Sequence, residues 1–383
     1  MKLKVALAVC NYNRKDMILA CIESVLSQGL ENIALCVVDN ASTDGSDEAL
    51  FDRFGNRIAL HRNQVNEGSS GGFAKSISMA VMTAAEFILV MDSDCILCPG
   101  SLSHLIQHLQ KNPQTAVVGP KIVAAEPAGV IQEIGAYLDW NRGVFKLNYG
   151  GYNESVDGPV TEIQHVDYVP ACCLLARSSA IKIWGNMRPD FFLYFDDIEW
   201  CTRIKRGGGS IDAIPTATAV HHSGGKNRKN NMVTYYYWRN RIHFFRLYAP
   251  QEFPGNLGNN LIGEAVRAVA TSRTLGLMNA GSAIQAATID GLSGRWGQAD
   301  LHQMGFLHLD PPSPWQSARK PGTLVRRVEH VLEDANAEDA SIPGLLLRDP
   351  FGKLISAQNA WRLKEPFTNE KARLRELFYS YAR

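Results

Sequence analysis

Two aspartates separated by one residue follow an apolar segment early in the chain. The apolar residues 87–91 lead directly into Asp92, Ser93 and Asp94. Carboxylate oxygens are preferred ligands of hard divalent cations such as Mg²⁺ and Mn²⁺, and a cation held this way can neutralise the charge of a diphosphate. Taken by itself the pair is better explained as a turn after a strand. About one pair with this spacing is expected by chance in every chain of this length. Other residues must therefore support the site.

Polar residues also end two earlier apolar segments. Asp39 follows the apolar run 34–38 and precedes 40–46, a sequence typical of a turn that leads into a helix. A carboxylate at this place can accept hydrogen bonds from a nucleobase or ribose, although turn formation explains it equally well. The residues after the first apolar run, 5–9, include Asn11, Asn13 and Arg14. We expect all of them at the nucleotide-binding edge of one sheet.

A glycine-rich stretch, 66–72, opens a helical pattern. Its Asn66, Gly71 and Gly72 could bring backbone N–H groups and a helix N-terminus to a phosphate donor. The stretch matches neither of the common phosphate-loop patterns, and a flexible turn is an equally good interpretation.

An apolar segment from 191 to 195 ends in three acids. Asp196 and Glu199 have the spacing of a capping box, which gives both a structural role and leaves Asp197 without one. A carboxylate on the first turn of a helix can act as a general base towards a hydroxyl group. The alternative interpretation is that Asp197 is a solvated helix residue without a catalytic role.

Two adjacent histidines end the strand predicted at 211–220. A neutral imidazole is a suitable third ligand for a manganese-type ion, and one of His221 and His222 could serve while the other packs. Further on, Arg239 or Arg241 could contact phosphate, although a solvated helix face explains them as well.

The order of predicted elements indicates an α/β fold. Apolar runs at 5–9, 34–38, 58–60, 87–91 and 116–118 alternate with helical patterns at 16–27 and 72–84, which predicts a mainly parallel, Rossmann-like sheet. Residues 130–225 predict an appended smaller mixed sheet. From about 232 the chain becomes mostly helical, with charged helices expected at 323–332 and 369–381.

Composition limits the kinds of partner and location. The 383 residues carry 39 basic and 38 acidic side chains, so no general field attracts nucleic acid. No signal-peptide pattern and no apolar run of about 20 residues is found, which predicts a cytoplasmic protein.

The eight cysteines fit reduced thiols, and Cys95 with Cys98 lacks the second pair that a zinc site requires. A basic, aromatic C-terminal helix could lie on a membrane, but a solvated or self-associating helix is the preferred interpretation.

Taken in order, these motifs resemble glycosyltransferase family 2. The resemblance covers residues 3–248, with 9–14 similar to its opening strand and loop, 37–45 to its nucleotide-binding strand end, and 92–94 to its DxD motif. Residues 195–199 resemble the acidic motif whose second residue is the base, which again selects Asp197. The motifs are closest to bacterial rhamnosyltransferases and galactofuranosyltransferases, where a strand-end histidine completes the metal site; the following residues favour His222 over His221.

The resemblance implies a GT-A fold, with a catalytic domain at 1–250 (nucleotide-binding half 1–120, acceptor-binding half 121–250) and a helical region at 251–383. It implies inverting transfer from a UDP- or dTDP-sugar to a saccharide or polyprenyl-linked saccharide, with Mn²⁺ or Mg²⁺ on Asp92, Asp94 and His222. Donor contacts are expected from Asn11, Asn13, Arg14, Asp39, Asn66, Gly71, Gly72, Asp92, Ser93 and Arg239. A sugar-phosphate nucleotidyltransferase and a noncatalytic carbohydrate-binding protein are the alternatives.

Overall fold

The computed structural model describes residues 5–222, 231–249, 254–274 and 277–300, together with two short strands, β13 (Leu346–Arg348) and β14 (Leu354–Ser356). The chain divides into two compact units. The first comprises Met1–Asp139 and Phe145–Lys226, and the second comprises Trp140–Val144 and Asn227–Arg383. Helix α8 (Asn231–Tyr248), which the sequence analysis placed in the catalytic domain, therefore belongs to the second unit.

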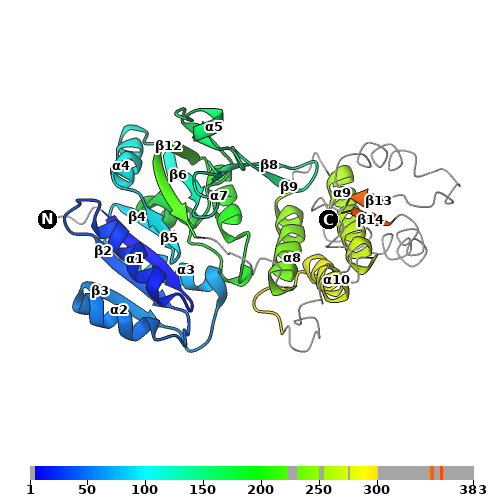
Figure 1. Cartoon of the computed structure of the whole chain (residues 1–383), viewed down its shortest axis with the longest axis horizontal. Coiled ribbons are helices and arrows are strands. Elements are labelled where there is room, and N and C mark those ends of the chain that lie inside the picture. Colours follow the sequence, from blue (N-terminus) through cyan, green and yellow to red (C-terminus); the bar gives the residue numbers. More distant parts are fainter. Residues whose placement is uncertain are drawn as a thin grey trace, which may run out of the picture. The chain divides into compact units, whose positions relative to one another are not determined.

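A ten-stranded sheet runs through the first unit (Figure 1). Its main path is β10-β12-β6-β11-β4-β1-β2-β3. Strands β1 (Val5–Asn11), β2 (Ala34–Asp39), β3 (Ile58–Arg62) and β4 (Phe87–Asp92) run parallel to one another. Strand β11 (Cys173–Arg177) runs antiparallel to both β4 and β6 (Thr115–Ala124). Strand β12 (Ser210–His221) pairs in parallel with β6.

The mixed strands extend this sheet instead of forming a separate one, because β11 joins the parallel strands to β6. Strands β5 (Cys95–Leu97) and β10 (Gln164–His165) pair with β12, and β7 (Ile131–Glu133) pairs with β6. A separate two-stranded sheet is formed by β8 (Ala136–Asp139) and β9 (Val144–Leu147). The predicted α/β class with parallel strands and a small additional sheet is confirmed.

Alternation along the strands explains how the helices cover both faces of the sheet. In β1, Val5, Leu7 and Val9 belong to a buried apolar cluster that includes residues of α1 (Lys15–Leu26), α2 (Ser46–Phe54) and α4 (Ser101–Lys111). The intervening residues are smaller, and α3 (Gly68–Met82) packs against β1 and β2. The remaining helices are α5 (Glu154–Asp157), α6 (Ser178–Trp184), α7 (Asp196–Arg206), η1 (Gly55–Arg57) and η2 (Pro189–Phe191).

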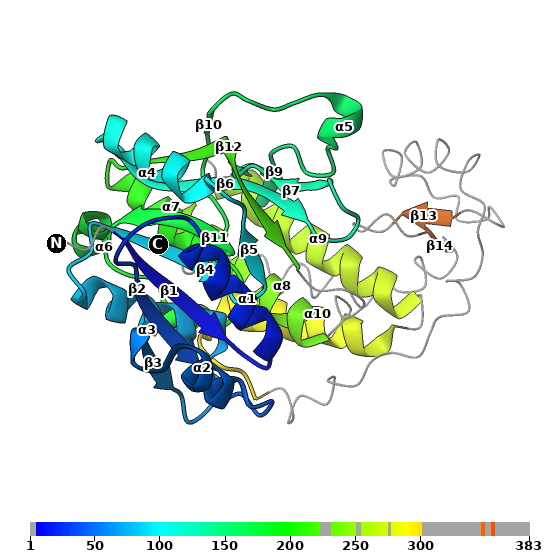
Figure 2. The same ribbon diagram turned by 60° about the vertical axis from the view of Figure 1, so that its left-hand side comes forward.

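The described residues between 231 and 300, which belong to the second unit, are mostly helical, as expected. Helix α10 (Met278–Ser293) packs against both α8 and α9 (Pro254–Thr274), and Figure 2 shows the three together. The Tyr235 hydroxyl donates to Asp290 at 2.6 Å, which ties α8 to α10. Among the described helices, none has the length and apolar character needed to span a bilayer. The helices predicted at 323–332 and 369–381 lie outside the described residues.

Candidate active site

The carboxyl ends of the parallel strands bring the predicted residues into one row. Asn11, Asp39 and Arg62 are register partners across β1, β2 and β3, and Cys10 of β1 pairs with Asp92 of β4. Ligands of such sheets bind beyond the carboxyl ends of the strands. The sheet thus gathers the residues predicted to bind the nucleotide and the aspartate motif at one edge.

Hydrogen bonds around Asp39 fix the turn that follows β2. This fully buried carboxylate accepts from the Ser42 backbone N–H at 3.0 Å and from the Asn11 amide at 3.4 Å. The Asn13 side-chain oxygen accepts from the Thr43 N–H at 2.7 Å. Arg62, which the sequence analysis did not select, donates to the Ser42 carbonyl at 3.0 Å. Its position at the end of β3, like those of Asn11 and Asp39 at the ends of β1 and β2, could have indicated it from the sequence.

The glycine-rich stretch has a structural role. Helix α3 begins at Gly68, four residues earlier than predicted, and its Ser70 N–H donates to the Phe192 carbonyl at 3.2 Å. The Asn66 side chain accepts from the Asn40 amide and from the Gly68 N–H. A Cβ on Gly72 would lie 2.0 Å from Cys10 Sγ, and one on Gly71 would lie 2.7 Å from Glu67 Cβ. Close packing therefore explains these glycines, and their predicted donor contact stays a prediction.

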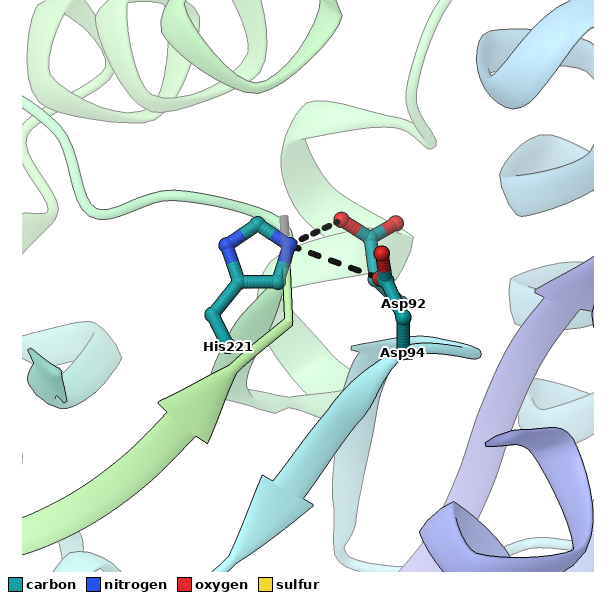
Figure 3. A group of neighbouring side chains, drawn as sticks. All are labelled: Asp92, Asp94 and His221. Carbon is teal, nitrogen blue, oxygen red and sulfur yellow. Dashed lines mark ion pairs between the residues drawn. The ribbon is translucent and has the colours of Figure 1, made fainter. Parts of the chain in front are cut away.

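Three side chains with metal-ligating atoms meet at the ends of β4 and β12 (Figure 3). His221 Nε2 lies 3.6 Å from Asp92 Oδ2 and 3.4 Å from Asp94 Oδ1, and one ligand atom from each residue fits within a mutual distance of 4.8 Å. Two carboxylate oxygens and an imidazole nitrogen form a donor set that suits Mn²⁺ or Mg²⁺. Ser93, between the aspartates, is buried.

The structure places His221 in this group, whereas the sequence analysis preferred His222. Successive side chains of a strand point to opposite faces, so two adjacent histidines cannot both face the aspartates. His222 is exposed and contributes its backbone N–H, which donates to the Asp94 carbonyl at 2.9 Å.

Charges of both signs meet in this group and shift one another's pKa values. Burial and the neighbouring Asp94 raise the pKa of Asp92 to about 6. Burial also acts to raise the pKa of Asp94, but the hydrogen bond and charge of His221 and the charge of Arg14 outweigh it and hold this pKa below its usual value. For His221, burial opposes the charge, yet Cys172 and the two aspartates raise the pKa to about 11. Since a buried thiol is neutral at pH 7, the carboxylates are the partners that hold this charge.

Asp197 lies on the first turn of α7, beside this group. Its Oδ2 accepts from the Ala171 N–H at 3.1 Å and its Oδ1 from the Ile198 N–H at 2.7 Å. Burial raises its pKa. Its charge in turn acts on Asp92, which places the two carboxylates within electrostatic reach of each other. The carboxylate is thus held in a fixed orientation.

The expected capping box does not form. Helix α7 starts at Asp196, and the N-cap is Phe195, in the left-handed region at φ 69°. Glu199 instead forms an ion pair with Arg203 at 2.8 Å, one turn along the helix. Burial, followed by the charge of Asp197, raises the pKa of Asp196 to about 7. The residues before it, Phe192, Tyr194 and Phe195, all have positive φ, a strained conformation that is typical of functional loops.

Strand β7 contributes two residues that the sequence analysis missed, Gln132 and Glu133. Gln132 contacts His221. Burial, and then the charge of Asp197, raises the pKa of Glu133 to about 8, and its Oε2 has no hydrogen-bond partner. The two polar residues follow Ile131 in a strand of three residues, and no motif marks them.

Arg239 belongs to the second unit. It is buried, lies over the rings of Tyr235 and Tyr236, and donates to the Gly297 carbonyl at 2.7 Å. Arg241 is buried as well and pairs with Glu264 at 2.7 Å. These contacts hold the second unit together, and a phosphate contact by either arginine stays a prediction.

Comparison with known proteins finds a family match within the first unit. Residues 7–184 match the family model described as Glycosyl transferase family 2. Over these residues, a little under half of the chain, the protein resembles glycosyltransferase family 2. The GT-A architecture expected for this family agrees with the parallel strands and the extended mixed sheet described above. Within the matched range lie Asp39, Asp92, Asp94 and Gln132, whereas Asp197 and His221 lie beyond it.

Individual relatives are similar to the chain over parts of its length. The chain is 22% identical over 230 residues to N-acetylglucosaminyl-diphospho-decaprenol L-rhamnosyltransferase of Mycobacterium tuberculosis, covering 53% of this chain and 72% of the relative. It is 24% identical to galactofuranosyltransferase GlfT2 of Mycolicibacterium smegmatis, covering 62% of this chain and 40% of the relative. The solved structure of S. aureus TarS is 16% identical with a TM-score of 0.49, covering 76% of this chain and 81% of that one. The predicted similarity to rhamnosyl- and galactofuranosyltransferases is confirmed.

Proposed function

We propose that this glycosyltransferase is a metal-dependent, inverting enzyme. It would transfer a hexose or deoxyhexose from a UDP- or dTDP-sugar to a hydroxyl of a saccharide or polyprenyl-linked saccharide. The process it would serve is bacterial cell-surface polysaccharide synthesis. The similarity to a rhamnosyltransferase and a galactofuranosyltransferase favours these two sugars.

The observation that carries the proposal is the meeting of Asp92, Asp94 and His221 beside the oriented carboxylate of Asp197. Their donor atoms suit a hard divalent cation, and the negative charge that they concentrate favours its binding. Bound there, Mn²⁺ or Mg²⁺ would neutralise the charge that develops on the departing diphosphate.

The residues of the chain supply the other parts of the reaction. Asp39 and Asn11, at the ends of β2 and β1, would bind the nucleoside, and Arg14 would contact the diphosphate. Asp197 would accept the proton of the acceptor hydroxyl while that oxygen bonds to the anomeric carbon. The bond from this carbon to the diphosphate breaks on the opposite face, so the anomeric configuration inverts.

A donor screen followed by product analysis tests the proposal. UDP-, dTDP- and GDP-sugars are first compared by thermal shift with and without Mn²⁺, because a ligand that binds the native state raises the melting temperature. The stabilising donor is then incubated with saccharide acceptors. Free nucleoside diphosphate and a product of inverted anomeric configuration are expected. Pyrophosphate released from a nucleoside triphosphate and a sugar phosphate would indicate a nucleotidyltransferase, and donor binding without turnover a noncatalytic protein.

Location and assembly are further parts of the proposal. A cytoplasmic enzyme could reach a polyprenyl-linked acceptor on the inner face of the membrane, and self-association would be compatible with this. Sedimentation with anionic liposomes at low and high salt tests the membrane contact, since electrostatic binding weakens as salt is added.

A further inference from the structure

Gln132 holds His221 through two contacts from a single side-chain amide. Its Nε2 donates to the backbone carbonyl of His221 at 3.4 Å, and its Oε1 lies 3.0 Å from the Nδ1 of the same residue. A backbone carbonyl can accept but never donate, so the first contact determines which end of the amide carries the NH₂ group. The oxygen of Gln132 therefore faces the imidazole.

This orientation determines where the imidazole carries its proton. A carbonyl oxygen accepts hydrogen bonds, so Nδ1 of His221 must be the protonated nitrogen. In the neutral ring the lone pair is then on Nε2, the atom that lies 3.6 Å from Asp92 and 3.4 Å from Asp94. We propose that Gln132 is the positioning residue of the metal site and fixes His221 as an Nε2 ligand. This inference rests on the metal-dependent function proposed above.

The backbone around Gln132 makes this contact a fixed one. Strand β7 pairs with β6, with Ile131 opposite Val123 and Glu133 opposite Ile122. Strand β6 in turn pairs with β12, with Ala124 opposite His221. Gln132 thus reaches the histidine from a strand that is hydrogen-bonded into the same sheet. Metal-binding histidines commonly depend on a hydrogen bond at the second ring nitrogen for their orientation and basicity.

Calorimetric titration of the metal-free protein with Mn²⁺ tests the proposal without relying on activity. Gln132→Met keeps the length of the side chain and removes both hydrogen bonds, so Mn²⁺ affinity should fall about 10- to 100-fold. Gln132→Glu keeps an acceptor for Nδ1 and should restore at least wild-type affinity. Gln164→Met is the matched control, because Gln164 is half-buried on β10 and hydrogen-bonds with Asn148 and Glu162. It should bind Mn²⁺ as the wild type does.

Each result has a separate meaning. Gln132→Met binding within two-fold of wild type would overturn the inference and leave the proposed function standing. A wild-type protein that binds no Mn²⁺ would overturn both. Nitrogen-15 spectra of histidine-labelled protein with Mg²⁺, assigned with His221→Asn, should show the proton on Nδ1; a proton on Nε2 would contradict the proposal. If Gln132→Met lowers the unfolding midpoint of the metal-free protein, Gln132→Ser and Gln132→Glu provide the comparison, with weak binding expected for Ser alone.

Discussion

Arg14 Nη1 lies 2.9 Å from Asp94 Oδ2, while the other oxygen of that carboxylate, Oδ1, faces His221. The two oxygens of Asp94 thus have different partners. Oδ1 is directed towards the candidate cation site, and Oδ2 is paired with a half-exposed guanidinium group from the loop after β1.

Replacing Arg14 should separate cation binding from donor binding. In Arg14→Met a positive charge beside the cation site is lost, and we expect Mn²⁺ affinity without nucleotide to rise about 3- to 10-fold, equivalent to about 1 kcal/mol. The KM for the donor should rise, because the diphosphate loses a charged partner. Calorimetry and initial rates measure the two effects. Arg53→Met, which removes an exposed ion pair with Glu23, is the control. Weaker Mn²⁺ binding by Arg14→Met would contradict the expectation.

Asp197→Asn should abolish the transfer reaction. The amide cannot accept the proton of the acceptor, so kcat should fall at least about 10²- to 10⁴-fold while the donor Kd stays within a few-fold. Rapid-quench rates and donor titrations make the comparison. Asp190→Asn, seven residues earlier and paired with Arg188, should retain activity. Near-normal turnover of Asp197→Asn would remove this residue from the mechanism.

The pH dependence of the reaction should reflect the environment of Asp197. A base works in its ionised form, so kcat/KM should fall as the pH is lowered through its pKa. Because burial raises this pKa, the acid limb should lie above the ordinary value of 3.8. Rates from about pH 4 to pH 9 at saturating Mn²⁺ give the profile. A limb at or below the ordinary value would show that another group titrates.

Glu133 should make the metal-free protein less stable as the pH rises. Its pKa increases from 4.5 in the unfolded chain to about 8 in the folded protein, so the folded state binds the additional proton. The stability that this proton provides is complete below about pH 4.5 and is lost as the pH approaches 8. Since Glu133 is only partly buried, this shift is discounted and we expect an effect on the order of 1–2 kcal/mol. Urea unfolding with a chelator should show a flatter pH profile for Glu133→Gln, and an unchanged slope would oppose this account.

Gly72→Ala should destabilise the contact between α3 and β1. The new Cβ would lie 2.0 Å from Cys10 Sγ, and such overpacking costs about 1–3 kcal/mol. Cys10→Ala removes the clashing atom, so the double variant should be more stable than the sum of the two single changes predicts. Urea unfolding of the four proteins measures the coupling. If the changes in unfolding free energy are purely additive, the new Cβ does not clash with the sulfur of Cys10.

The parts of the site that follow from local pattern were predictable from sequence. The apolar runs predicted β1, β2 and β4, and the polar residues directly after them placed Asp39 and Asp92 at one sheet edge. The choice between His221 and His222 depends on the register of β12 against β5 and β6, where His221 pairs with Cys95 and Ala124. That register involves residues about a hundred positions apart, and the sequence of β12 does not reveal it.

Long-range contacts and local backbone conformation explain the other differences. Gln132 lies far in sequence from His221, so its hydrogen bonds had no local signature. The prediction of a capping box at Asp196 was wrong, because Phe195 adopts a left-handed conformation and is itself the N-cap residue. The start of α3 at Gly68 likewise depends on a carbonyl from a distant loop.

The hydrogen bond between Ser70 and Phe192 limits how parts of this protein can be exchanged with those of a relative. The carbonyl that receives the first turn of α3 comes from the segment that leads into α7, the helix of Asp197. A chimera that takes residues 68–82 from one parent and residues 189–206 from another would combine two surfaces that never evolved together. Recombination designed to alter donor choice while keeping the acceptor should therefore transfer both segments as a single block.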